Sequence, residues 1–417
     1  MTRVTGRSSG TTYGGGMLTS SLSSSGPALS VGLATVLAGA LALSGCTSEP
    51  KAPKAPAAAK TSAAPTTTAV ATQPPFTAKG VPAALATVIK PLYLGGAVPS
   101  SPSAAKALSQ RKPVKAAGQP VSVNGAVGVW KGARIAVVTM GNDVTLAVAA
   151  PRWKVVGGWW PSMGVSAPSL GAASHRVLVI GSDARPGQAV DRSRADSLHI
   201  VGFDGQGGGG VLGIARDSYV QLSTGGRGKI NSALALGGPL ALQRTVVSAT
   251  GVPLDGYLIT GFAGFKKLID GLGGLPIKVP VTVVGAGADV TIKAGANELT
   301  GREALAYGRQ RHSVAGGDFG RSANQGLLIM AAGGFAKLAG PAKIPAILAK
   351  AAPNIGTNLS AEQVLTLAAG AFVTRPSKVH NRVAAGSIGM TSGGESIVLF
   401  DGLARRLFAD MRDGNLS

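Results

Sequence analysis

The chain has 417 residues, which is enough for two modest domains with terminal extensions. Its hydrophobic content of 45% excludes a largely disordered protein, and its 62 glycines with few aromatic residues predict an aliphatic core broken by many turns. The net charge of +22 favours polyanionic partners. Because the sequence has no basic stripe interleaved with stacking aromatics and no known reading motif, we expect no nucleic-acid partner.

The amino-terminal segment has the order of an export signal. Residues 28–45 are apolar or small and follow Arg3 and Arg7. The run ends in Leu-Ser-Gly-Cys, which resembles the bacterial lipobox, so we expect residues 1–46 to be a lipoprotein signal peptide and Cys46 to be lipidated. An uncleaved anchor helix is the alternative, since about 18 apolar residues can just span a bilayer. Both interpretations predict a protein held at the extracytoplasmic face of the cell membrane.

Residues 47–74 consist mainly of Ala, Pro, Thr and Lys, which predicts a disordered tether. Residues 75–170 are then expected to form a small β-rich accessory region without a catalytic pattern. Strands are predicted at 125–130, 134–140 and 143–149, the last two joined by a Gly-Asn turn that favours antiparallel pairing. The tryptophans at 153, 159 and 160 suit packing against this sheet or, as the alternative, carbohydrate stacking.

Residues 174–340 alternate between strand-like and helix-like segments. Apolar runs predict strands at 176–180, 197–203, 211–214, 256–260 and 275–284. Helices are predicted at 239–249, 263–272 and from Arg321 to about Leu338, and capping boxes pair Thr300 with Glu303 and Ser360 with Gln363. This order predicts an α/β sandwich with helices on both faces of a mixed sheet, completed by helical and strand segments in residues 341–417.

Charged pairs recur at the ends of three predicted strands. Three such pairs are Asp183 with Arg185, Arg194 with Asp196, and Arg216 with Asp217. Further polar residues follow downstream: Lys229, Asn231, Arg309, Arg311, Asp318, Arg321 and Gln325. Side chains at the ends of sheet strands project into the crevice where α/β folds bind ligands, so we expect these groups to converge.

Converging arginines repel one another unless an anion holds them, and their planar forks match phosphate oxygens. Aspartates in the same cluster would need a hard cation, Mg²⁺ or Mn²⁺, to bridge them to phosphate. Any single Arg-Asp pair is more often a surface ion pair, but three pairs at successive strand ends favour a metal-diphosphate site. There is no Walker-type loop and no His/Cys cluster; His199 is expected in the core, and His175 and His312 are expected in loops without a clear role.

Ordered sequence blocks between residues 174 and 338 resemble the LytR-CpsA-Psr family, phosphotransferases that join glycopolymers to peptidoglycan. The blocks include VLVIGSDAR, RADSLHIVGF, VLGIARDSYV, KINSALALGG, LTGREALAYGRQR and GGDFGRSANQ. The resemblance implies a mixed α/β core with an apolar channel for a polyprenyl chain and a diphosphate held at its mouth. IARD stands where the family commonly has Pro before Arg-Asp, and a lipobox is less usual in the family than a transmembrane anchor.

The resemblance also assigns roles to residues. Asp183 and Asp196 look like the carboxylates of the magnesium site, and Arg216, Arg309 and Arg311 like the main diphosphate clamp. The residues expected to complete or brace the clamp are Arg185, Arg194, Arg321, Gln325, Asn231 and Asp217.

The implied reaction transfers a phosphoglycan from a polyprenyl-diphosphate carrier to a peptidoglycan hydroxyl, with the C6 hydroxyl of muramic acid as the expected acceptor. The expected catalytic residues are Arg216, Arg309 and Arg311, with Asp183 accepting the hydroxyl proton. Two alternatives remain open at this point. One is hydrolysis of a polyprenyl diphosphate at the same site, and the other is a non-catalytic lipoprotein that binds wall polymer through its positive charge.

Overall fold

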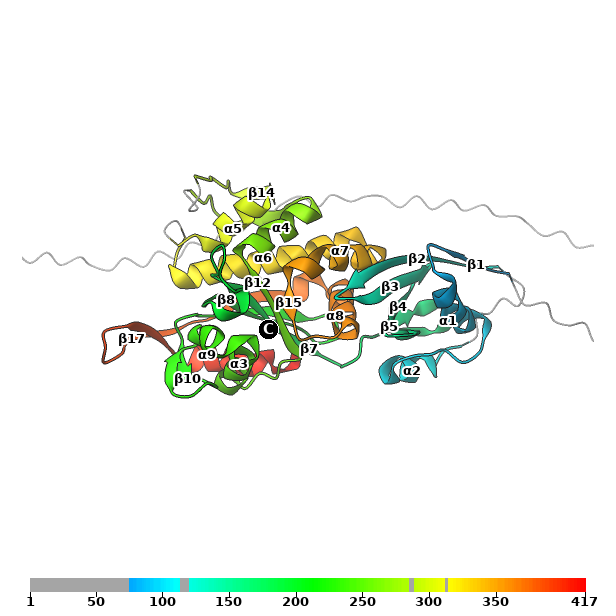
Figure 1. Ribbon diagram of the computed structural model, residues 1–417, viewed down its shortest axis with the longest axis horizontal. Helices are drawn as coiled ribbons and strands as arrows, with labels where there is room; N and C mark the ends of the chain where they lie inside the picture. The colour runs from blue at the N-terminus through cyan, green and yellow to red at the C-terminus, as the bar shows by residue number, and fades with distance from the viewer. Residues whose placement is uncertain (1–74, 113–119, 285–288, 312–313) are drawn as a thin grey trace, which may run out of the picture. The chain divides into compact units, whose positions relative to one another are not determined.

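The computed structural model describes residues 75–112, 120–284, 289–311 and 314–417 (Figure 1). The expected signal peptide with Cys46, the expected tether and His312 lie outside the described residues.

Residues 75–170 form a six-stranded sheet in the order β1-β2-β3-β4-β5-β6. The strands are β1 (Phe76–Lys79), β2 (Val121–Trp130), β3 (Ala133–Met140), β4 (Asp143–Ala149), β5 (Trp153–Trp160) and β6 (Val165–Ser169). The three strands predicted from the sequence are present and pair antiparallel. The helices α1 (Ala83–Leu94) and α2 (Pro102–Leu108) pack with one face, where Trp153 and Trp160 are buried, so these two tryptophans serve packing.

The second face of this sheet packs against helices that follow the central sheet in sequence, α7 (Ile344–Ala351) and α8 (Ala361–Val373). One hydrophobic cluster contains Trp130 and Leu146 from the sheet together with Leu348 and Leu365 from these helices. Because Lys154 Nζ also lies 2.8 Å from Glu362 Oε2, apolar and charged contacts both join the accessory sheet to the core.

The central sheet has the order β15-β12-β7-β8-β9-β16. Its strands are β7 (His175–Ser182), β8 (Ala195–Phe203), β9 (Gly209–Ile214), β12 (Gly256–Gly261), β15 (Gly356–Thr357) and β16 (Val379–Ala384). β8 is antiparallel to both β7 and β9, whereas β12 and β16 pair parallel to β7 and β9. The predicted mixed sheet is therefore confirmed.

Helices cover both faces of the central sheet (Figure 1). The apolar side chains of α3 (Ser232–Thr250) and α9 (Gly402–Asp410) share a buried cluster with β7, β8 and β9. The helices α4 (Phe262–Leu272), α5 (Gly301–Arg309) and α6 (Asp318–Ala339) lie on the opposite side in Figure 1. Both predicted capping boxes form at the starts of α5 and α8, and each satisfies amide donors that the first turn leaves unpaired.

Some elements differ from the predictions. The strand expected at 275–284 stops early as β13 (Leu275–Val279), because Pro280 has no amide donor to continue the ladder, and it pairs with β14 (Gly295–Leu299) outside the central sheet. The helix expected at 239–249 is present after a kink at Gly238, and α3 also includes a helical segment before the kink that begins at Ser232. Two further small ribbons appear, β10 (Tyr219–Gln221) with β11 (Arg227–Lys229) and β17 (Gly386–Met390) with β18 (Ser396–Phe400).

Within the described ranges, no single helix has the length and apolar composition needed to cross a bilayer. The helix α6 and the segment Pro341–Asn354 meet those criteria only as a pair, bent by 107°.

Candidate functional site

The candidate site lies at one edge of the central sheet, which we call the mouth edge. The strands β7, β9, β12 and β16 end there, and the antiparallel strand β8 begins there. The Arg194-Asp196 pair therefore reaches this edge from the start of a strand and not from its end. Ser182 pairs with Ala195, and Asp183 N donates to Arg194 O across 3.0 Å.

Asp196 is the centre of the charge cluster at the mouth edge. Arg321 Nη1 from the first turn of α6 lies 2.9 Å from Asp196 Oδ1, and Arg216 Nη1 contacts the same oxygen. Neither of these contacts involves Asp196 Oδ2. One carboxylate oxygen therefore holds two guanidinium groups that come from segments more than a hundred residues apart.

Asp318 is a second carboxylate of the cluster; it was among the polar residues expected to converge, but no role was assigned to it from the sequence. Its Oδ1 lies 3.0 Å from Arg321 Nη2, 3.2 Å from Arg311 Nε and 3.8 Å from Arg216 Nε. The signal for it was the spacing GGDFGR, which places Asp318 three residues before Arg321, one helical turn away. Three guanidinium groups thus share two carboxylates, and the cluster retains a positive charge.

Burial and charge give this cluster the character of an anion site. Burial alone would raise the pKa of Asp196, but the charges of Arg321 and Arg216 outweigh it and hold that pKa below its usual value. Burial, together with repulsion from Arg321 and Arg216, lowers the pKa of Arg311 despite the nearby carboxylates. The Nε atoms of Arg216 and Arg321 are buried and have no hydrogen-bond partner. A bound polyanion would relieve the repulsion among these groups.

Two predicted residues brace the cluster. Asp217 Oδ1 lies 3.4 Å from Lys229 Nζ, and its Oδ2 lies 3.7 Å from Arg216 Nε. Asn231 is buried; its amide donates to Arg216 O across 3.2 Å, and its carbonyl accepts from Ala195 N across 3.3 Å. Through backbone groups these contacts join Arg216, two residues after the end of β9, to the start of β8, so Asn231 positions the two segments.

The described histidines that we singled out have structural roles. His199 is fully buried, its Nε2 lies 2.9 Å from Ser322 O, and burial lowers its pKa to about 4. The expectation that His199 belongs to the core is therefore correct. His175 was expected in a loop, but it is the first residue of β7, where its ring contacts Leu170 O and Asp255.

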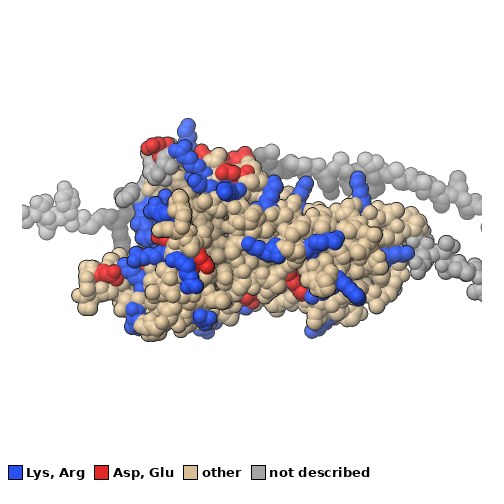
Figure 2. Space-filling model, in the orientation of Figure 1, with Lys and Arg blue, Asp and Glu red and all other residues tan. Residues whose placement is uncertain are grey.

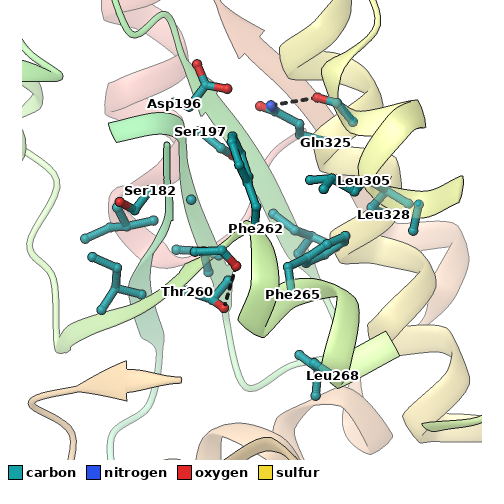
Figure 3. Close-up of a pocket in the computed structure, with 18 of the residues that line it drawn as sticks. Ser182, Asp196, Ser197, Thr260, Phe262, Phe265, Leu268, Leu305, Gln325 and Leu328 are labelled. Atoms are coloured by element: carbon teal, nitrogen blue, oxygen red, sulfur yellow. Dashed lines mark hydrogen bonds between the residues drawn. The ribbon is translucent and has the colours of Figure 1, made fainter. Parts of the chain in front are cut away.

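A cavity of about 290 Å³ runs from the cluster into the core, between β7 and β12 on one side and α4, α5 and α6 on the other (Figure 3). Its walls are almost entirely apolar because successive turns of α4 and α6 point side chains into it, including Phe262, Phe265, Leu268 and Leu328. Figure 3 shows Asp196, Ser197 and Gln325 at one end and Leu268 at the other. The cavity therefore has a polar end at the charge cluster and an apolar interior.

Arg309 and Gln325 also line the cavity. The Arg309 guanidinium lies 4.8 Å from the centre of the Phe262 ring, a cation–π contact that aims this exposed side chain across the opening. Gln325 Nε2 donates to Gly308 O across 2.9 Å and ties α6 to α5.

Arg185 and Arg194 are exposed on the segment between β7 and β8, and Asp183 is partly buried at the end of β7. None of these three has a side-chain contact as close as those of Asp196.

The site can supply only part of a metal's ligands. In the part of the chain that the structure describes, no three His, Cys, Asp or Glu side chains gather as metal ligands. Magnesium is commonly held by one or two carboxylates together with water and substrate phosphates. Asp196 and the nearby Asp183 fit this way of holding magnesium when a diphosphate supplies further oxygens. Asp196 Oδ2 would be the ligand atom, because both arginine contacts are made by Oδ1.

Comparison with known proteins identifies the family. Residues 165–403 match the LytR_cpsA_psr family model. Regulatory protein MsrR of Staphylococcus aureus is 37% identical over 153 residues, covering 36% of this chain and 45% of MsrR. TagV of Bacillus subtilis, named a polyisoprenyl-teichoic acid–peptidoglycan teichoic acid transferase, is 35% identical over 186 residues, covering 42% of this chain and 48% of TagV.

The fold agrees with the sequence match. The crystal structure of Bacillus subtilis TagV aligns with a TM-score of 0.50 and 29% identity, covering 58% of this chain and 98% of the TagV structure. The matched segments span about half the length of the curated relatives. Because the family model covers more than half of the chain, including every residue of the charge cluster, this protein belongs to the LytR_cpsA_psr family.

Proposed function

We propose that this protein transfers a phosphoglycan from a polyprenyl-diphosphate carrier to a hydroxyl of peptidoglycan. The observation that carries the proposal is the junction of two environments, because an apolar cavity ends at a cluster of three arginines and two aspartates. A polyprenyl diphosphate has the matching order, a long apolar chain joined to a polyanionic head. The name of the relative TagV supports a transfer of teichoic acid to peptidoglycan by a protein of this fold.

The residues of the site suit the electrostatic demands of phosphoryl transfer. The acceptor hydroxyl oxygen attacks the glycan-linked phosphorus, the bond from that phosphorus to the bridging oxygen breaks, and polyprenyl phosphate leaves with the bridging oxygen. Arg216, Arg309 and Arg311 stabilise the charge on the phosphoryl oxygens, which is most of what such a transfer requires. The hydroxyl proton passes to a carboxylate, for which we propose Asp183.

Asp183 and Asp196 would hold Mg²⁺ or Mn²⁺ together with the diphosphate. A bound divalent ion supplies additional positive charge at the phosphoryl oxygens. The chain's own contribution is to keep Asp196 ionised, since the neighbouring arginines lower its pKa, and to keep water away from the apolar side of the diphosphate.

An acceptor-dependence assay tests the reaction. Purified protein with a synthetic polyprenyl-diphosphate glycan should attach the phosphoglycan to added peptidoglycan and release polyprenyl phosphate in equal amount. Release of free phosphoglycan at the same rate with and without peptidoglycan would instead assign hydrolysis to the site.

The same preparation tests a purely binding role. If the protein only retains polymer through positive charge, Arg309→Ala and Arg311→Ala should weaken polymer binding in small, additive steps. An abrupt loss of covalent attachment with unchanged polymer retention supports the transferase.

A further inference from the structure

The mouth edge of the central sheet also carries most of the exposed large apolar side chains. Twelve such side chains occur among the described residues, and seven of them lie on segments that begin or end at this edge. Two more, Val281 and Val284, lie in the connection after β13, which Gln310 contacts through Val284 O. The other three are Val127 and Val129 on the accessory sheet and Leu338 near the end of α6. Burial of apolar surface is favourable, so a concentration of exposed apolar groups around a charged opening needs a physical reason.

The hairpin β17–β18 is the most exposed part of this surface. It follows β16 directly at the mouth edge, and Figure 1 shows it projecting away from the central sheet. Ile388 and Met390, two residues apart and therefore on one face of the ribbon, are 73% and 68% exposed. Val398, the cross-strand partner of Ile388, donates its amide hydrogen to Asp217 O across 3.0 Å. The exposed ribbon is thus fixed next to the residue that follows Arg216.

Other segments bring apolar groups to the same edge. Leu236 and Leu240 are 61% and 49% exposed in the first turns of α3, which starts beside Arg216 and Ala195. Val284, 59% exposed, lies in the connection after β13, where its carbonyl accepts from Gln310 Nε2 across 2.8 Å. Since Gln310 separates Arg309 from Arg311, this connection lies beside the clamp.

Exposed cations accompany the apolar groups. Arg382 is the third residue from the end of β16, and Arg405 and Arg406 follow Leu403 in the first two turns of α9. Figure 2 shows Lys and Arg side chains gathered at the left of the view, on the side of the core from which the hairpin projects. Apolar groups flanked by Arg and Lys are typical of surfaces that lie in the interface of an anionic bilayer.

We propose that the mouth edge is a membrane-docking surface, on which the hairpin β17–β18 inserts Ile388 and Met390 among the lipids of an anionic bilayer. The inference rests on the proposed function in one respect: the donor's polyprenyl chain lies in a membrane and must reach the cavity through this opening. Exposing that chain to water on the way is strongly unfavourable, so an opening pressed against the bilayer provides a continuous apolar path.

Lipid quenching tests the contact without measuring catalysis. The four tryptophans of the chain lie on β2 and β5 of the accessory sheet, so a tryptophan added at the mouth edge reports a separate place. Full-length Ile388→Trp protein is reconstituted into vesicles of brominated or ordinary phosphatidylglycerol. The added emission of Ile388→Trp should fall by about half in brominated lipid, because the side chain reaches the acyl region. Leu338→Trp, at a position that is more exposed (86%) but away from this edge, should show no added quenching.

A second experiment connects docking to the reaction. The double variant Ile388→Asp/Met390→Asp should transfer from a long-chain donor embedded in vesicles about tenfold more slowly than wild type, since two inserted side chains are lost. It should retain wild-type rates with a short-chain, water-soluble donor, because the arginine cluster is untouched. The matched control Leu338→Asp should behave as wild type with both donors.

The outcomes separate the docking surface from the proposed function. Absence of quenching at residue 388, or equal quenching at 388 and 338, overturns the docking surface. Cross-linking between copies at residue 388 without lipid quenching assigns the hairpin to self-association and also overturns it. If wild-type protein transfers from neither donor while residue 388 is quenched, the proposed function fails and the docking surface stands.

Discussion

Arg321 donates to Asp196 across 2.9 Å and thereby ties the first turn of α6 to the first residues of β8. The Arg321 side chain is almost completely buried, so this ion pair is structural as well as electrostatic. It fixes the distance between the sheet, which carries Arg216, and the helix, which carries Asp318. The diphosphate clamp that we propose is therefore pre-organised by a buried charge pair.

The variant Asp196→Asn should be unstable as well as inactive. Two guanidinium groups would lose the carboxylate that neutralises them in a buried setting, and breaking a buried pair costs about 3–5 kcal/mol. Urea unfolding followed by circular dichroism measures the change in the free energy of unfolding. The exposed Asp289→Asn is a suitable control, expected within about 0.5 kcal/mol of wild type. Equal stability of Asp196→Asn and wild type would contradict the structural role of this pair.

Stability should depend on His199 in weakly acidic solution. Its pKa is lowered from 6.5 to about 4 by burial, so the unfolded chain binds a proton before the folded protein does. The stability that the neutral, buried His199 contributes is complete above pH 6.5 and is lost as the pH falls through about 4. At 1.36 kcal/mol per pKa unit, this loss lowers the free energy of unfolding by roughly 3 kcal/mol. Urea unfolding between pH 7.5 and 4.5 should show this decline, and His199→Gln should flatten it. The lowered pKa of Asp196 acts only at lower pH.

The variant Arg311→Ala should lose transfer activity by about a hundredfold while changing stability little. The Arg311 side chain is 40% exposed, so its removal leaves no deeply buried carboxylate without a partner. Its charge lies at the proposed anion site. Single-turnover transfer rates and a urea midpoint measured on the same preparation separate the two effects. Arg302→Ala, exposed on the same helix as Arg309 and away from the cavity lining, provides a comparison. If the urea midpoint fell so far that unfolding accounted for the lower transfer rate, Arg311 would support the fold instead.

Removing divalent ions should stop transfer but not lipid binding. The apolar cavity holds the chain, whereas the proposed metal joins the diphosphate to Asp183 and Asp196. Treatment with EDTA followed by Mg²⁺ titration should restore the rate. Asp183→Asn, which also loses the proposed proton acceptor, should show a lower maximal rate and require a higher Mg²⁺ concentration for half-maximal activity. Full activity in EDTA would remove the metal from the proposal.

Filling the cavity should exclude the lipid. Ala332 lines the cavity from α6, so Ala332→Phe should reduce polyprenyl lipid co-purified from membranes, measured by mass spectrometry. Ala339→Phe, exposed at the end of the same helix, keeps the added ring outside the cavity and should leave the lipid content unchanged. Equal lipid content in both variants would argue that the cavity does not hold the carrier.

Sequence patterns that span only a few residues predicted helix starts and strand pairing correctly. The capping boxes at Thr300 and Ser360 fixed two helix starts, and the Gly-Asn turn predicted the pairing of β3 with β4. The end of a strand and the exposure of a hairpin were harder to predict, because they depend on tertiary contacts. The strand predicted to reach residue 284 stops at Pro280, and the hairpin β17–β18 has a sequence of ordinary apolar alternation whose exposure only the tertiary structure shows.

Part of the site could be predicted from the sequence. Charged pairs that follow parallel strands, or precede the antiparallel strand between them, lie at the same edge of the sheet. The structure joins Asp196, Arg216, Arg311 and Arg321, and places Arg309 and Gln325 in the cavity lining. Asp318 was expected near the cluster, but its role could not be predicted, because its contacts depend on where α6 begins relative to a strand more than a hundred residues earlier. The roles of Asp183, Arg185 and Arg194 stay predictions, since their partners would be the substrate and the metal.

The hydrophobic cluster shared by the accessory sheet and α7–α8 has a consequence for the protein's modularity. A shortened version that starts at His175 would keep the whole arginine cluster, yet it would leave Leu348 and Leu365 without the strands that cover them. Such a fragment should aggregate or expand on heating even though every reacting group is present. Replacement of residues 75–170 by another small sheet would therefore succeed only when the facing side chains of the two helices are changed as well.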